Sequence, residues 1–249
     1  GFVWVARELT PQQEERIMRL GIPGLDFVTE SKRFYPGGSV AAHIMGTVNI
    51  DNVGIAGVER YLDDDSLSLL QELGLARGSA LTPVELAMDV RVQHVLHHEL
   101  TDAIERYNAV AAAGAVMDIH TGEIIAMASL PDFDPNVPAT ILEEGRFNRI
   151  TAGKFEPGST FKTMTFAAAL DAGAIRLTDR IDARFDMRFG RFSISDYRGQ
   201  YRVLSVPEVY RYSSNIGTIK IMQELGKDNF RAFVRRMGFE GTPSIELPE

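Results

Sequence analysis

The segment Pro-Gly-Ser-Thr-Phe-Lys at residues 157–162 constrains the fold of this chain most, because it places a hydroxyl and an amine one helical turn apart. The Pro-Gly pair predicts a turn. The alanine-rich run behind it favours a helix over residues 160–170, with Gly173 as the stop. Residues three apart share one helix face, so Ser159 and Lys162 are expected to come within hydrogen-bond reach.

This spacing suits an activated serine. A serine becomes nucleophilic when a neighbouring base takes its proton, and lysine can act as that base only in its neutral form. Burial and the positive end of the helix macrodipole both lower the pKa of a lysine, and the same helix start offers the Ser159 N–H to a developing oxyanion. The alternative is that Ser159 is a helix N-cap and Lys162 a surface lysine, and spacing alone does not separate the two.

A second motif follows 54 residues after Ser159, where Tyr-Ser-Ser-Asn-Ile-Gly at residues 212–217 contains Ser-x-Asn in Ser213 and Asn215. By itself it could be a polar turn or a helix cap. In this order and spacing, the two motifs resemble the first two signatures of the penicillin-binding protein and serine β-lactamase superfamily.

The resemblance extends over nearly all 249 residues. Five segments resemble the pedestal region of class B penicillin-binding proteins: Phe-Val-Trp-Val-Ala-Arg (2–7), Gly-Ile-Pro-Gly (21–24), Tyr-Pro-Gly-Gly (35–38), Ala-His-Ile-Met-Gly (42–46) and Gly-Ile-Ala-Gly-Val-Glu (54–59). Residues 111–135 are similar to the opening hairpin of the transpeptidase domain, and residues 206–215 look most like the division-type enzymes.

The fold class that this resemblance implies is α+β. We expect an irregular α+β pedestal module over residues 1–75 and the N-terminal part of a transpeptidase domain over residues 76–249. The third motif of the superfamily, Lys-Thr/Ser-Gly, does not occur in this sequence. In the family it lies on a later sheet strand, so the sequence is expected to be a fragment without a complete site.

The implied function is that of a serine-type D,D-transpeptidase, which cross-links peptidoglycan stem peptides through an acyl-serine. By resemblance, Ser159 is the nucleophile, Lys162 its base, Ser213 a proton relay and Asn215 a substrate-binding residue. No metal or organic cofactor is implied. The implied partners are D-Ala-D-Ala stem peptides, β-lactams, division proteins and a membrane glycosyltransferase. The implied location is the periplasmic face of the cytoplasmic membrane, where an N-terminal anchor that the chain itself does not contain would hold the protein.

Two rival functions fit part of the sequence. A class D-like β-lactamase or β-lactam sensor also carries Ser-Thr-Phe-Lys, but such domains reach the nucleophile much sooner than the 158 residues that precede Ser159 here. A non-catalytic scaffold that docks to division proteins would not need both motifs. A Lys-Thr/Ser-Gly within roughly 100 residues after Glu249 would separate the enzyme from the scaffold.

Composition excludes further classes. The net charge of −8 provides no basic surface for nucleic acid, and the chain has no cysteine for disulfides, thiolate metal sites or thiol catalysis. No run of 18 apolar residues occurs. The arginine- and aromatic-rich residues 180–203 resemble a nucleic-acid patch, but the alternation around residues 189–192 favours a short hairpin next to the active site.

Three further elements are predicted. Residues 11–20 form a short helix capped by Thr10, and residues 89–107 form a helix whose buried face includes Leu96, Leu100 and Tyr107. His94 and His98 on that helix could chelate a metal, although a polar helix face is the better interpretation because no His-Glu-x-x-His pattern is present. Residues 116–127 form a hairpin about His-Thr-Gly at 120–122.

Overall fold

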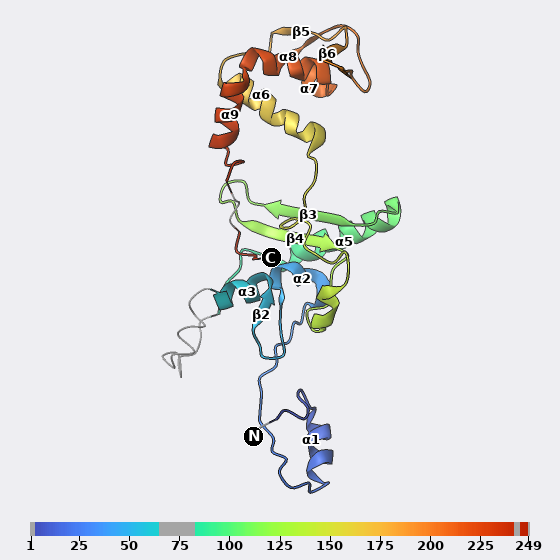
Figure 1. The fold of residues 1–249 in the computed structure, drawn as a ribbon, viewed down its shortest axis with the longest axis vertical. Coiled ribbons are helices and arrows are strands. Elements are labelled where there is room, and N and C mark those ends of the chain that lie inside the picture. Colours follow the sequence, from blue (N-terminus) through green and yellow to red (C-terminus); the bar gives the residue numbers. More distant parts are fainter. Residues whose placement is uncertain (1–2, 65–82, 242–244, 249) are drawn as a thin grey trace. The chain divides into compact units, whose positions relative to one another are not determined.

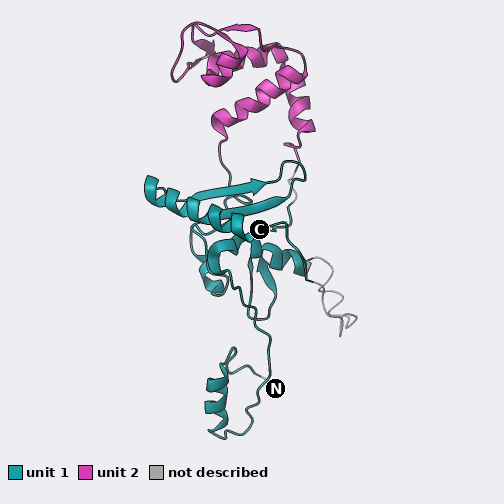
Figure 2. Ribbon diagram, turned by 180° about the vertical axis from the view of Figure 1, so that it is seen from behind, with its two compact units in different colours: residues 1–154, 245–249 teal, residues 155–244 magenta. Residues whose placement is uncertain are grey.

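The computed structural model describes residues 3–64, 83–241 and 245–248, which form two compact units (Figures 1 and 2). Unit 1 comprises residues 1–154 and 245–249, and unit 2 comprises residues 155–244. The predicted domain boundary at residue 75 lies outside the described residues. The division into residues 1–75 and 76–249 therefore stays a prediction.

Unit 1 joins short N-terminal elements to a long helix and a hairpin. Its elements are α1 (Pro11–Met18), η1 (Gly38–Ala41), α2 (Ala42–Met45), β1 (Thr47–Val48), β2 (Gly54–Ala56), α3 (Gly57–Asp64), α5 (Val90–Tyr107), β3 (Ala112–Met117), β4 (Ile124–Leu130) and η2 (Pro138–Leu142). Strands β1 and β2 pair antiparallel, as do β3 and β4.

Helix α1 begins as the sequence predicts. The Thr10 hydroxyl accepts from the Gln13 N–H at 3.3 Å, and the Gln13 side chain accepts from the Thr10 N–H at 2.8 Å, which is a reciprocal capping box. Pro11 occupies the first helical position, where its missing N–H costs nothing. The helix ends at Met18, two residues before the predicted end.

The predicted hairpin is confirmed and is longer than expected. Strands β3 and β4 pair from Ala112↔Leu130 to Met117↔Ile124, and Gly122 supplies the positive φ of +80° in the turn. Helix α5, capped by Asp89, lies along both strands (Figure 1). The prediction that Tyr107 is buried is wrong, because α5 ends at this residue and its side chain is 73% exposed.

Gln93 of α5 is buried and joins the helix to the sheet. Its side-chain amide donates to the Met127 carbonyl at 2.8 Å and to the Val40 carbonyl at 2.6 Å, and its Oε1 accepts from the Met127 N–H at 2.8 Å. The side chain thus satisfies both backbone groups of Met127 on β4, as a neighbouring strand would. It is 1% exposed, so water does not compete for these bonds.

We expect Gln93→Ala to lower the free energy of unfolding of unit 1 by roughly 2–4 kcal/mol, because it leaves the two buried backbone groups of Met127 and the half-buried Val40 carbonyl without this partner and opens a void. Urea denaturation, with hydrogen exchange at the Met127 amide, measures this. Glu99→Ala on the exposed face of the same helix is the control, with an expected change within about 0.5 kcal/mol. Equal effects in both variants would contradict the prediction.

Unit 2 is a small helical layer with two short sheets. Its elements are η3 (Gly158–Phe161), α6 (Lys162–Asp171), β5 (Arg180–Asp182), β6 (Met187–Phe189), β7 (Phe192–Ile194), β8 (Val203–Ser205), α7 (Val206–Arg211), α8 (Asn215–Leu225) and α9 (Lys227–Arg236). Strand β5 pairs with β8, and β6 with β7. The β6–β7 pair, in register Phe189↔Phe192, confirms the predicted hairpin.

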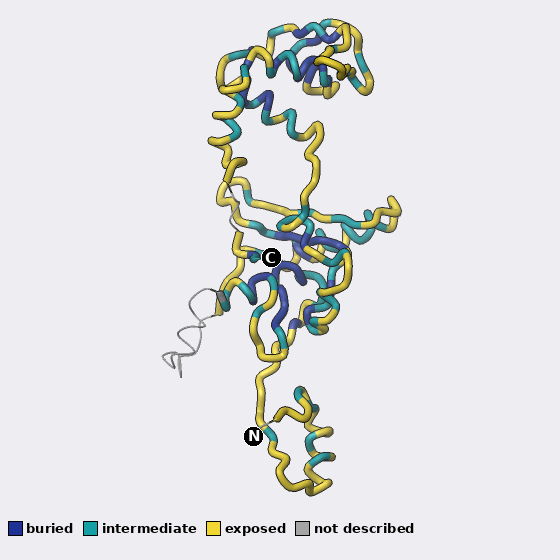
Figure 3. Tube along the Cα trace, viewed as in Figure 1, coloured by how far each residue is buried: buried dark blue, intermediate teal, exposed yellow. Residues whose placement is uncertain are grey.

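Each unit has its own buried core (Figure 3). In unit 2, helices α6, α8 and α9 pack on one another, and residues such as Ala169, Val209 and Ile221 are fully buried between the elements. Gly217 of α8 faces Val209 of α7, where an added Cβ would lie 2.5 Å from a Val209 methyl. The missing side chain therefore lets α7 and α8 approach at the turn between them.

Candidate active site

Ser159 lies in η3, directly before α6. Gly158 takes a positive φ of +56° at the start of this turn, a conformation that glycine adopts without strain. The backbone N–H of Lys162 donates to the Ser159 carbonyl, which places the two residues one turn apart, as predicted. The Ser159 side chain is exposed, and Lys162, the first residue of α6, is partly buried.

The Lys162 ammonium group points to the second motif. Its Nζ donates to the Ser213 carbonyl at 2.6 Å, to the Ser213 Oγ at 3.0 Å and to the Asn215 Oδ1 at 2.7 Å. These contacts bring Ser213 and Asn215, which follow Lys162 by 51 and 53 positions in the sequence, next to the first motif. Three acceptors match the three protons of an ammonium group. In the part of the chain that the structure describes, no hydrogen bond joins Lys162 to the Ser159 hydroxyl, so the expected direct contact is not formed.

The second motif is the turn between α7 and α8. Ser213 takes a left-handed conformation with φ +52°, and its N–H donates to the Tyr210 carbonyl at the end of α7. Ser214 is the N-cap of α8, where its Oγ accepts from the Gly217 N–H at 2.9 Å. Asn215 is the first residue of α8. The turn therefore presents the Ser213 hydroxyl and the Asn215 amide on the same side as Lys162.

Burial lowers the pKa of Lys162 below the ordinary value of a lysine, since desolvation disfavours its charged form. The negative charge of Asp196 acts in the opposite direction and limits this decrease. A lowered pKa increases the fraction of neutral lysine at a given pH, and only neutral lysine can accept a proton. The direction of this change is the one that a base requires.

Sequence reasoning missed Ser195 and Asp196. The Ser195 carbonyl accepts from the Asn215 Nδ2 at 2.9 Å. Asp196 accepts from the Ser214 hydroxyl at 2.7 Å and from the Ile216 N–H at 3.0 Å. No spacing rule marks an aspartate 18 residues before the serine that it contacts. Its position just after the predicted hairpin was the available signal.

The model of the penicillin-binding protein transpeptidase domain matches residues 112–249, more than half of the chain. The chain belongs to this family. The transpeptidase match begins at the first strand of the β3–β4 hairpin and includes both motifs. The predicted α+β transpeptidase fold is therefore confirmed.

Curated relatives of this chain include proteins named as peptidoglycan D,D-transpeptidases FtsI and PenA. It is 38% identical over 241 residues to a Caulobacter vibrioides protein named "Probable peptidoglycan D,D-transpeptidase FtsI", covering 97% of this chain and 40% of the relative. The Escherichia coli K12 peptidoglycan D,D-transpeptidase FtsI is 31% identical, with 88% and 40% covered. These matches confirm the predicted class B, division-type membership. The chain spans about 40% of the length of these relatives.

Solved structures agree with the transpeptidase fold. Penicillin-binding protein 3 of Mycobacterium tuberculosis is similar with a TM-score of 0.73 at 26% identity, covering 87% of this chain and 49% of that one. A structure titled as a putative peptidoglycan glycosyltransferase from Atopobium parvulum gives a TM-score of 0.72 at 27% identity, covering 87% of this chain and 52% of that one.

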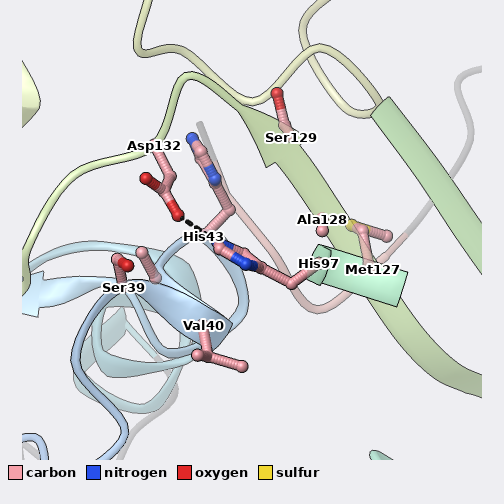
Figure 4. Close-up of a pocket in the computed structure, with 9 residues that line it drawn as sticks. Ser39, Val40, His43, His97, Met127, Ala128, Ser129 and Asp132 are labelled. Atoms are coloured by element: carbon pink, nitrogen blue, oxygen red, sulfur yellow. Dashed lines mark hydrogen bonds and ion pairs between the residues drawn. The ribbon is translucent and has the colours of Figure 1, made fainter. Parts of the chain in front are cut away.

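His97, Asp132 and Ser129 form a second group of side chains that could take part in catalysis. They lie in unit 1, and their hydrogen bonds give them a structural role. His97 of α5 bonds to Asp132 at 2.7 Å at a small surface hollow that Ser129 and His43 also line (Figure 4). The Ser129 hydroxyl donates to the Phe147 carbonyl and accepts from the Arg149 N–H. Because both bonds hold the loop after β4, Ser129 is not paired with His97 as a nucleophile. His94 and His98 are exposed on the polar face of α5.

Proposed function

We propose that this chain carries the nucleophile of a peptidoglycan D,D-transpeptidase that acts in septal cell-wall synthesis, with Ser159 forming the acyl-enzyme. The observation that supports this most directly is the Lys162 side chain, which links the turn after Ser159 to Ser213 and Asn215. Family membership and the relatives named as peptidoglycan D,D-transpeptidases point to the same reaction.

In the proposed first step, the Ser159 Oγ attacks the carbonyl carbon of the penultimate D-alanine, and its proton moves to neutral Lys162. The C–N bond to the terminal D-alanine then breaks, and the leaving nitrogen takes a proton through Ser213. An ester links Ser159 to the stem peptide. The amine of a neighbouring strand then attacks this ester, which forms the cross-link and returns a proton to Ser159.

The contacts of unit 2 support these roles. The 3.0 Å contact between Lys162 Nζ and Ser213 Oγ is a direct path for a proton between base and relay. The Asn215 amide is held at both ends, by Ser195 at its Nδ2 and by Lys162 at its Oδ1, which fixes its orientation for a substrate amide. The Ser159 hydroxyl is exposed, so a peptide carbonyl can reach it.

The proposed substrates are D-Ala-D-Ala stem peptides, and β-lactams are proposed to acylate the same serine. The proposed partners are division proteins and a membrane glycosyltransferase, and the proposed location is the periplasmic face of the cytoplasmic membrane, through an N-terminal anchor. Within the described residues, no helix has both the length and the apolar character that crossing a bilayer requires.

Acylation by benzylpenicillin tests the proposal. In a longer protein that carries these 249 residues and the third motif of the family, we expect intact-mass spectrometry to show one penicilloyl adduct. Peptide mapping should place it on Ser159, the serine of the first motif. An adduct on any other serine, or a folded protein that gains none, would contradict the proposed function.

A further inference from the structure

Ser195 and Asp196 directly follow β7. They form hydrogen bonds to three successive residues at the second motif: Ser214, Asn215 and Ile216. Asp196 Oδ2 accepts from the Ser214 hydroxyl at 2.7 Å, and Asp196 Oδ1 accepts from the Ile216 N–H at 3.0 Å. Between these two contacts, the Ser195 carbonyl accepts from the Asn215 side-chain amide. The β6–β7 hairpin is thus joined to the turn that presents Ser213 and Asn215 to Lys162.

The contacts of Asp196 are directional. Ser214 is 1% exposed, and its hydroxyl has one proton, which goes to Asp196, while its oxygen accepts from the Gly217 N–H. Asp196 and Ser214 therefore satisfy two of the free N–H groups in the first turn of α8, those of Ile216 and Gly217. A carboxylate is also stabilised at this end of the helix by the macrodipole. Asn215, the first residue of α8, is anchored from both sides.

Asp196 also acts on Lys162 through its charge. Its negative charge opposes the effect of burial on the pKa of Lys162. The other groups that meet this segment of α6 from α7 and the following turn are uncharged: the Ser213 and Asn215 oxygens on Lys162, and the Tyr210 hydroxyl on Thr163 at 3.0 Å.

We propose that Asp196 is a positioning residue of this site, which fixes the Ser213–Asn215 turn through Ser214 and Ile216 and whose negative charge acts on Lys162 from behind that turn. The inference rests on the proposed function only for its effect on acylation. Its effect on Lys162 can be measured on this chain without any activity. This role also explains the position of the β6–β7 hairpin, because the hairpin places Asp196 at the start of α8.

The first test is the titration of Lys162 in the 249-residue chain by NMR of ¹³C-labelled lysine. The chain has only five lysines, so Lys162→Arg assigns the signal. Asp196→Asn removes the charge that raises the pKa of Lys162, so the Lys162 signal should titrate at lower pH than in the wild type. The matched control is Asp186→Asn on the same segment, an exposed carboxylate for which the described contacts include no bond or ion pair. It should leave the Lys162 titration unchanged.

The second test is acylation by benzylpenicillin in the longer protein. Asp196→Asn should slow acylation about tenfold, the loss expected for one charge-assisted hydrogen bond, and should move the rise of the rate with pH to lower pH. Asp196→Glu keeps the charge but displaces the carboxylate, so it should slow acylation and keep the wild-type pH profile. A merely structural residue would lower the rate in both variants without moving the profile.

The outcomes separate this inference from the proposed function. If the wild type is not acylated, the proposed function fails, and the Lys162 titration still tests Asp196. If Asp196→Asn behaves like Asp186→Asn in both measurements, the inference is overturned. Should Asp196→Asn not fold, Ser214→Ala carries the test. This variant removes the hydroxyl that donates to Asp196 and keeps the charge of Asp196. Acylation should therefore slow with an unchanged pH profile. A wild-type acylation rate would overturn the inference.

Discussion

A Ser159→Ala variant is expected to lose covalent labelling by a fluorescent penicillin by at least about 10⁴-fold, measured in a longer protein that carries these residues and the third motif. Alanine has no lone pair to attack the β-lactam carbonyl, and no other group of the site replaces the missing oxygen. The substitution should leave the fold intact, because the Ser159 side chain is exposed in the η3 turn. Thermal unfolding should therefore change by less than about 0.5 kcal/mol.

The matched control is Ser193→Ala on β7, which removes an exposed hydroxyl from the same unit. We expect this variant to label like the wild type. The contrast separates loss of a nucleophile from a general loss of a serine hydroxyl. Wild-type labelling in Ser159→Ala would place the nucleophile elsewhere and remove the basis for the proposed roles of Lys162, Ser213 and Asn215.

Local signals in the sequence predicted the elements well. Thr10 with Pro11 and Gln13 defines the start of α1, and Gly122 defines the turn of the β3–β4 hairpin, because each acts through its own neighbours. Tyr107 was misplaced since a helical periodicity continues to the last turn even where the surface that it packs on has ended. Gln93 gave no signal, because a polar residue that replaces a strand partner looks like any other polar helix position.

The site was predictable only in part. Helical spacing alone placed Ser159 and Lys162 one turn apart, and this is confirmed. Lys162 donates to Ser213 and Asn215 and not to Ser159. This choice of partners depends on how α6 packs against α8, which no local sequence pattern encodes. The family resemblance paired the two motifs, but Asp196 lies outside both. Tertiary contacts alone identify it.

The Lys162→Arg variant is expected to be nearly as damaged as Ser159→Ala, with acylation by benzylpenicillin slowed by at least about 10³-fold. Guanidinium stays protonated at any pH that the protein survives, so it cannot accept the Ser159 proton. It still carries the positive charge and the donors that the Ser213 and Asn215 oxygens now receive from Lys162. The variant therefore removes the base and keeps much of the structural role of the side chain.

Stopped-flow acylation between pH 6 and pH 9, with thermal unfolding of each variant, measures the difference. In the wild type the acylation rate should rise with pH as Lys162 loses its proton. Because burial lowers the pKa of Lys162, this rise should occur at a lower pH than the titration of an exposed lysine. In Lys162→Arg the rise should be absent. Lys227→Arg on α9, an exposed position of the same unit, should retain the wild-type rate and profile. If Lys162→Arg acylates within tenfold of the wild type while Lys227→Arg is unaffected, another group takes the Ser159 proton, and Lys162 serves only to hold the turn.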